Sequence, residues 1–163
     1  MSIELLPLGM RWIHILSAIV ALGGVVFIRF VLIPSAQQVL DDETHAKLRT
    51  TITRRWMKFV HTCILLFLIS GFYNYLVVQR PIHDGQAIYH ALFGVKFLLA
   101  LVVFALAVAL TSLKPWSEKL RANAKFWLML LIALAVIIVG ISGFMKFIPP
   151  APMPGIQVAT EQQ

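Results

Sequence analysis

The chain has 163 residues, of which 60% are apolar and 13% are charged, and its net charge at neutral pH is +7. An average soluble domain is about half apolar and about a quarter charged, so this composition excludes an ordinary soluble fold and an intrinsically disordered chain. Cys63 is the single cysteine, which also excludes a disulfide scaffold, a Cys-X-X-Cys redox pair and a cysteine-based zinc site.

Four long apolar segments follow one another along the chain, at about residues 8–33, 57–78, 89–113 and 126–147. Each is long enough, at roughly 20 residues or more, for a helix to cross a hydrocarbon core of about 30 Å. A helix also satisfies its backbone hydrogen bonds internally, as lipid requires. The sequence therefore predicts an all-α polytopic membrane protein, a single membrane domain over residues 1–163 whose four transmembrane helices form an up-down-up-down bundle.

The connections between these segments are expected to be short. The first is polar and extends from about Pro34 to Trp56, and the others cover about residues 79–88 and 114–125. A cluster of prolines predicts an irregular, mobile tail over residues 148–163. The first apolar segment is too long for the core of a signal peptide.

Basic residues are distributed unequally between the two sides of the membrane. The first and third connections hold nine of them: Lys47, Arg49, Arg54, Arg55, Lys58, Lys114, Lys119, Arg121 and Lys125. The other side holds three: Arg11, Arg80 and Lys146. The positive-inside rule then places both termini outside, on the periplasmic side of a bacterial inner membrane, and the charge indicates topology and not nucleic-acid binding. The tryptophans lie near segment ends, as in an interfacial belt: Trp12, Trp56, Trp116 and Trp127.

Two histidines at membrane depth are candidate ligands, because ionisable groups there are costly and mostly functional. His14 lies about five residues into the first span and His90 lies two or three residues into the third, so both occupy nearly the same level on the outer side. The two helices are diagonal partners in the bundle, and the imidazoles are expected to face each other across its core. Small residues follow His14 on its face and aromatics flank a glycine on the face of His90: Ser17, Ala18 and Ala21, then Phe93, Gly94 and Phe97. This predicts a cavity beside each imidazole, although small residues also permit close helix packing.

The other histidines fit a ligand role less well. His61 starts the second span on the opposite side and is followed on its face by large aliphatic residues, which predicts a packed or interfacial histidine. His45 and His83 lie in connections and are expected to be solvated. Lys96 lies about two turns inside the third span with no acidic residue in any span to pair with it, and is a candidate functional residue that Ser70 could bond.

Two imidazoles in a bundle core are typical axial ligands of haem, and the outer cations Arg11, Arg80 and Lys146 would suit its propionates. Copper is the alternative, because Met10 shares a helix face with His14, and Met145 and Met153 follow near the end of the chain. A third hypothesis is a structural subunit of a larger complex, whose histidines only pack. A homo-oligomer is compatible with each.

The sequence resembles two related families. The stretch RWIHILSAIVALGGVVFIRF, with His14, Gly24 and Arg29, is similar to the first helix of the bacterial HemJ-type protoporphyrinogen oxidases and of the copper resistance protein D family. RRWMKFVHTCILLFLISGFYN, YHALFGVKFLLAL and FMKFIPPAP resemble the later helices of the copper resistance group. The oxidase resemblance implies a b-type haem on His14 with Lys96 as a functional partner, and the copper resemblance implies copper handling at the outer face.

One departure bears on the activity. The oxidase family has an Asn-Glu-X-Pro motif entering its last helix, whereas this chain has ANAKFWLML, without the acid or the proline. Porphyrinogen oxidase activity is therefore not the expected reaction. The expectation is a membrane haem b protein in electron transfer or haem-linked redox chemistry, with a quinone, a porphyrin or a redox protein as partner.

Overall fold

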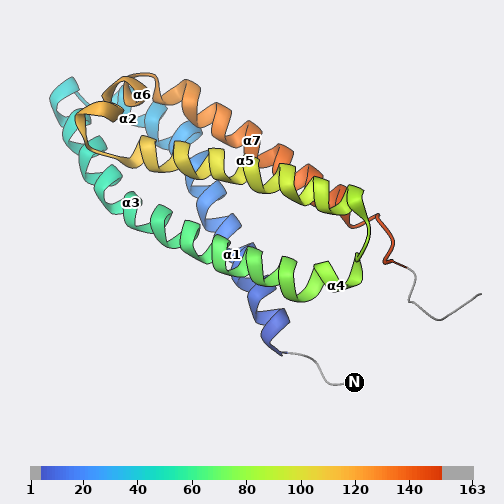
Figure 1. The fold of residues 1–163 in the computed structure, drawn as a ribbon. Helices are drawn as coiled ribbons and strands as arrows, with labels where there is room; N and C mark the ends of the chain where they lie inside the picture. The colour runs from blue at the N-terminus through green and yellow to red at the C-terminus, as the bar shows by residue number, and fades with distance from the viewer. Residues whose placement is uncertain (1–4, 152–163) are drawn as a thin grey trace, which may run out of the picture.

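Four long helical stretches form the molecule in the computed structural model, which describes residues 5–151 (Figure 1). Each is long and apolar enough to cross a membrane: Leu5–Val39, Asp42–Ile82, Ala87–Thr111 and Ala124–Met145. The predicted all-α bundle of four apolar helices is thereby confirmed.

The first stretch changes its helical pitch where a proline follows. It consists of α1 (Leu5–Phe27), the wider π-type turns of η1 (Ile28–Leu32) and α2 (Ile33–Val39). The N–H of Ile33 donates to the carbonyl of Ile28, five residues back. Pro34 has no N–H and its ring would clash with the carbonyl four residues earlier, so the helix widens upstream of it.

The second stretch repeats this arrangement. It consists of α3 (Asp42–Tyr73), the π-type η2 (Asn74–Gln79) and the short α4 (Arg80–Ile82), which contains Pro81. The N–H of Arg80 donates to the carbonyl of Tyr75, again five residues back. Each wide segment therefore ends two residues before a proline.

The second half of the chain is simpler. Gly85, at φ +72°, makes the turn that leads into α5 (Ala87–Thr111). An L-residue with a side chain is disfavoured in that left-handed conformation, which explains the glycine. The 3-10 turn η3 (Pro115–Ser117) and α6 (Glu118–Ala122) then connect to α7 (Ala124–Met145).

The first connection is not the polar loop that the sequence predicts. Helix α2 runs to Val39 and α3 begins at Asp42, so the chain leaves the helical conformation only briefly between them. Asp41 caps α3 by accepting hydrogen bonds from the backbone N–H and the hydroxyl of Thr44, at 2.9 and 2.8 Å. Polar residues limit how deep a helix lies in a membrane and not whether it is helical, so the helices extend past the apolar segments.

The cap at Asp41 should depend on pH. The hydrogen bonds from Thr44 lower the pKa of the Asp41 carboxyl in the folded protein. Because the folded pKa lies below the unfolded value of about 3.9, the stabilisation is complete above that pH and is lost as the pH falls through the folded pKa. We expect an NMR titration of the Asp41 carboxyl to give a lower midpoint in the wild type than in a Thr44→Ala variant, which lacks the hydroxyl that bonds this carboxylate.

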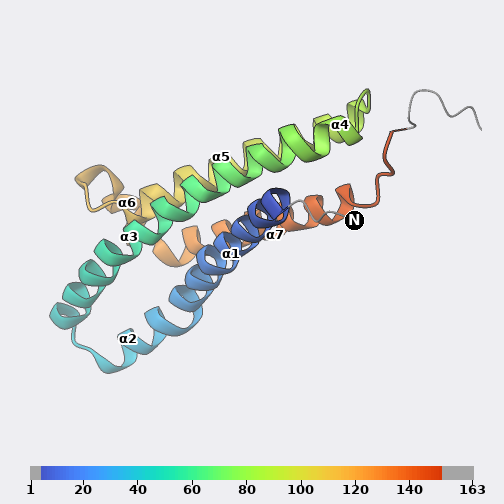
Figure 2. The same cartoon turned by 90° about the horizontal axis from the view of Figure 1, so that it is seen from below.

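The helices pack as two close pairs. Helix α1 lies against α3, and α5 lies against α7, while α3 contacts α5 and α1 contacts α7 (Figures 1 and 2). Helices α1 and α5 are therefore diagonal, as predicted. The start of α1, α4, the start of α5 and the end of α7 share one end of the bundle, which we call the α4 end, and the opposite end is the α6 end (Figure 1).

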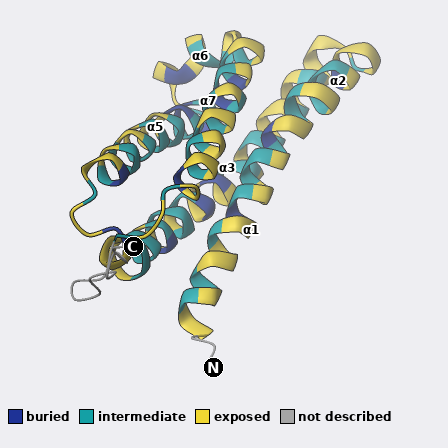
Figure 3. Ribbon diagram, turned by 90° about the vertical axis from the view of Figure 1, so that its right-hand side faces the viewer, coloured by how far each residue is buried: buried dark blue, intermediate teal, exposed yellow. Residues whose placement is uncertain are grey.

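Most of the apolar surface faces outward. Exposed residues cover the outer sides of all the long helices, and buried residues are few (Figure 3). The buried apolar cluster lies toward the α6 end and comprises Val25, Leu106, Leu128 and Leu131. A water-soluble bundle would bury its large aliphatic side chains, so this surface is that of a protein embedded in lipid.

Gly24 of α1 and Trp56 of α3 make a close helix contact. A Cβ atom at Gly24 would overlap the indole ring, so only glycine permits this packing. The sequence placed Trp56 in an interfacial belt, but its ring instead turns between the two helices and lines a cavity at the α6 end. Trp12 and Trp116 are exposed, as a belt requires.

Candidate functional site

His14 is held against α3 by a hydroxyl and an aromatic ring. Its Nδ1 lies 2.9 Å from Oγ of Ser70, and its ring meets Phe67 edge-on at a centroid distance of 5.0 Å. A Cβ added at Gly71 would lie 3.5 Å from Cε1 of His14, so the imidazole lies directly on the backbone of α3. The position of His14 is therefore fixed by one turn of α3.

The bonds of Ser70 decide the tautomer of His14. Ser70 is completely buried, and its Oγ lies 2.5 Å from the carbonyl of Leu66, to which the hydroxyl donates its hydrogen. The same oxygen then accepts from Nδ1–H of His14. This leaves the lone pair of His14 on Nε2, and no residue in 5–151 donates a hydrogen bond to that nitrogen.

His90 is likewise held by a hydroxyl, from the helical turns that continue α3. Its Nδ1 lies 2.9 Å from the hydroxyl of Tyr75. The Tyr75 ring stacks on Phe93 of α5 at a centroid distance of 3.5 Å and an interplanar angle of 4°. Tyr75 belongs to η2, so the wide turns before Pro81 set the direction of its side chain.

The structure thus brings both candidate ligands to the α3–η2 stretch. Ser70 and Tyr75 are five residues apart, which is about 7.5 Å along a helix. In each case Nδ1 is engaged by a hydroxyl from α3 or its continuation, and the other ring nitrogen has no hydrogen-bond partner within the described part of the chain. The direct facing of the two imidazoles stays a prediction.

Lys96 lies near this site but not with the partner that the sequence predicts. It is half-buried on α5 and lies within electrostatic range of His14. The expectation that Ser70 bonds Lys96 is wrong, because Ser70 is engaged by His14 and by the carbonyl of Leu66. The single ion pair recorded for residues 5–151 is elsewhere, between Lys47 and Glu43.

The remaining predicted residues lie around the same end. Met10 is half-buried on α1, one turn before His14, whereas Arg11, Arg80 and Lys146 are exposed at the α4 end. Met145 is buried at the end of α7, and Met153 lies outside the described residues. Three cations and two thioethers therefore share the end of the bundle that holds His14 and His90.

His61, which the sequence predicts to be packed or interfacial, contributes nothing to this site. It is exposed on α3, and its Nδ1–H donates to the carbonyl of Met57 in its own helix, at 2.7 Å. The prediction for His83 is wrong. That residue is buried, stacks on Tyr89 at 3.7 Å and donates to the Gln86 side chain at 2.8 Å.

This buried group at the α4 end continues into the last described residues. The Gln86 amide donates to the carbonyl of Pro149, and the N–H of Ala151 donates to the carbonyl of Ile82. The start of the predicted mobile tail is therefore bonded to the α4–α5 turn. His45, also predicted to be solvated, is half-buried and lines the cavity at the α6 end.

Two features were not predicted from the sequence: the hydroxyl partners of His14 and His90, and the cavity at the α6 end. Pro81 was the available signal for the first, since a proline after an apolar segment widens the preceding turns and turns Tyr75 toward α5. For the second, the signal was the accumulation of basic residues in the connections that close that end.

Within residues 5–151 no cluster of three or more histidine, cysteine, aspartate or glutamate side chains is placed to hold a metal ion. The chain was compared with models of known protein families, with curated proteins and with solved structures, and none of them matches. The length and composition of its helices make the chain a polytopic membrane protein with four apolar spans, without a family assignment.

Proposed function

We propose that this chain is an integral membrane b-type haem protein, with His14 and His90 as the axial ligands through Nε2. The observation that carries the proposal is the shared state of the two imidazoles. Each has Nδ1 bonded to a hydroxyl of the α3–η2 stretch, at 2.9 Å in both cases. Histidines that bind a metal through one nitrogen typically engage the other in such a bond, so the donor set suits haem iron.

Ser70 acts as the positioning residue for His14. Because its own hydrogen goes to Leu66, Ser70 selects the tautomer with the proton on Nδ1 and keeps Nε2 as a lone-pair donor. Tyr75 positions His90, and its stacking on Phe93 prevents the phenol from rotating away. Both imidazoles are therefore pre-organised without a ligand present.

The charges at the α4 end also support haem as the bound group. Arg11 and Arg80 are exposed there and suit carboxylates, and Lys96 places a cation near His14. Bound haem would supply reversible one-electron transfer. The partner would be a quinone, a porphyrin or a redox protein at the side of the membrane with fewer basic residues, which the positive-inside rule makes the periplasmic side. The resemblance of the first helix to haem-binding oxidases agrees with this proposal.

The test is an absorption spectrum of the full chain, purified in detergent from a haem-supplemented host, oxidised and then reduced with dithionite. We expect a Soret band and sharp reduced α and β bands, because two imidazole ligands give low-spin haem. A colourless protein from a host that loads a control cytochrome would contradict the proposal.

Copper is the second candidate, and Met10 favours it. Its thioether lies one turn before His14 on the same helix and is half-buried, and a thioether with an imidazole suits copper(I). Metal analysis of the colourless protein would separate the two remaining cases. Bound copper that is lost in both Met10→Leu and His14→Ala would indicate a copper carrier. No metal at all would leave a structural subunit whose histidines only pack.

A further inference from the structure

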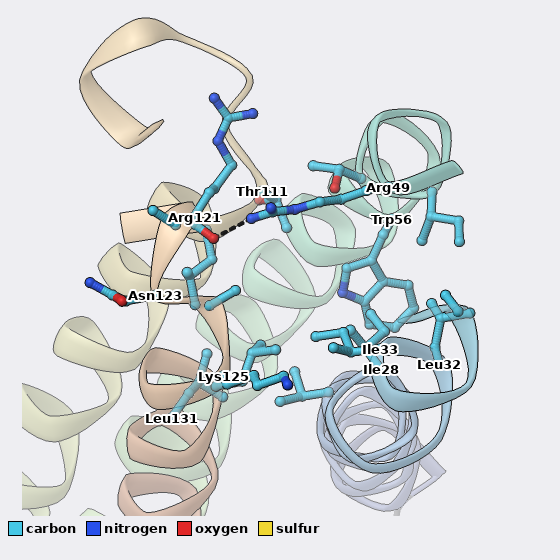
Figure 4. Close-up of a pocket in the computed structure, with 18 of the residues that line it drawn as sticks. Ile28, Leu32, Ile33, Arg49, Trp56, Thr111, Arg121, Asn123, Lys125 and Leu131 are labelled. Atoms are coloured by element: carbon cyan, nitrogen blue, oxygen red, sulfur yellow. Dashed lines mark hydrogen bonds between the residues drawn. The ribbon is translucent and has the colours of Figure 1, made fainter. Parts of the chain in front are cut away.

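A cavity of about 500 Å³ lies at the α6 end, and neither His14 nor His90 lines it (Figure 4). It is enclosed by η1, α2, α3, α5 and the α6–α7 region. Its inner wall is apolar and includes Ile28, Leu32, Ile33 and Leu131, with the Trp56 ring beside them (Figure 4). Its volume is within the range of pockets that bind small molecules.

The polar rim of this cavity is positively charged. Arg49, Arg121, Lys125 and His45 line it, and no aspartate or glutamate does so among the described residues. Arg49 donates a hydrogen bond to an uncharged group, the backbone carbonyl of Arg121. The guanidinium charges of Arg49 and Arg121 are close enough to repel each other. The rim therefore gathers like charges without a counter-ion.

One donor at this rim is buried and lacks a partner. Nε of Arg121 is inaccessible to solvent and makes no hydrogen bond with any residue in 5–151. Buried donors are almost always satisfied, and an unsatisfied charged donor is costly. Arginine pairs with phosphate through two parallel hydrogen bonds, so a phosphate group suits the terminal guanidinium nitrogens of Arg49 and Arg121.

We propose that the cavity binds an anionic phospholipid, with its phosphate between Arg49 and Arg121 and the start of an acyl chain along the apolar wall. The position supports a lipid: the cavity lies where the apolar spans give way to the basic connections, the level of lipid headgroups. Basic pockets between helices at that level are typical sites for anionic headgroups. A free phosphate would meet the charged rim but leave the apolar wall unused.

The experiment is native mass spectrometry of the full chain in detergent, titrated with phosphatidylglycerol and, separately, with phosphatidylcholine. We expect retention of phosphatidylglycerol by the wild type and about tenfold weaker retention by the Arg49→Gln, Arg121→Gln double variant. The matched control is Arg54→Gln with Arg55→Gln, which removes two exposed charges of α3 that do not line the cavity. Equal losses in the two double variants would overturn the proposal in favour of surface charge.

A second variant tests the apolar wall with every charge in place. Ala107 lines the cavity, and Ala107→Phe should fill it and weaken phosphatidylglycerol retention to a similar extent. Undiminished retention by a folded Ala107→Phe protein would overturn the proposal. Displacement of the lipid by millimolar inorganic phosphate would also overturn it, by assigning the site to a soluble phosphate. Thermal unfolding of each variant confirms that it is folded.

Discussion

Replacing His14 by alanine should abolish the Soret band of the purified protein, or shift it to that of a haem with one strong ligand. The change removes the only side chain of α1 that offers an imidazole, and Ser70 has no second nitrogen to place there. His90→Ala, which removes the imidazole that α5 supplies, should have the same effect on the Soret band. The measurement is the haem-to-protein ratio and the dithionite-reduced spectrum of each variant.

Ser70→Ala provides the graded test. The variant keeps the imidazole but removes the acceptor for Nδ1–H, so Nε2 is no longer selected as the lone-pair donor. Removal of such outer partners lowers metal affinity by about 10–100-fold, so we expect partial haem loss with a shifted spectrum. A Ser70→Thr variant retains a hydroxyl and should restore most of the wild-type spectrum, which a purely structural role of Ser70 in packing would not predict.

His61 lies on α3, the helix that also carries Ser70, and serves as the matched control. It is exposed, and its Nδ1–H is already used by the carbonyl of Met57. His61→Ala should leave the spectrum nearly unchanged. If His61→Ala bleached the protein and His14→Ala did not, the haem would lie toward the other end of the bundle and the assignment of the ligands would be wrong.

The transmembrane helices were predictable because hydropathy and length suffice to define them. Their ends were not, as the connection predicted from Pro34 to Trp56 shows. There α2 and α3 continue as polar helices, supported by the Asp41 cap and by the Lys47–Glu43 pair. A pattern of hydrophobic residues reports the position of the membrane, whereas the helix itself ends only where capping and backbone hydrogen bonds end.

The candidate site, too, could be predicted only in part from the sequence. The depth of His14 and His90 follows from counting residues along helices that begin on one side, so both could be singled out from the sequence. Their partners depend on the rotation of each helix about its axis, which residue counting does not give. Ser70 was accordingly paired with Lys96 and not with His14, and His83 was placed in solvent although the turn at Gly85 folds it against Tyr89.

Gly24→Ala should destabilise the protein by about 1–3 kcal/mol, the usual cost of overpacking a close contact. The new methyl group would overlap the Trp56 ring, which lies between α1 and α3. The measurement is reversible unfolding in mixed micelles, followed by circular dichroism.

Gly23 gives the control for this change. It is the neighbouring residue in α1, and a Cβ there would have no atom within 4 Å. Both substitutions raise helix propensity by about 1 kcal/mol, so Gly23→Ala should be neutral or stabilising and only the contact with Trp56 distinguishes the two. In a Gly24→Ala, Trp56→Leu double variant, the smaller leucine should accommodate the methyl group. The destabilisation of the double variant should therefore be less than the sum of the destabilisations of the two single variants. Strict additivity would mean that the α1–α3 pair is held elsewhere, and that His14 and Ser70 are not brought together by this contact.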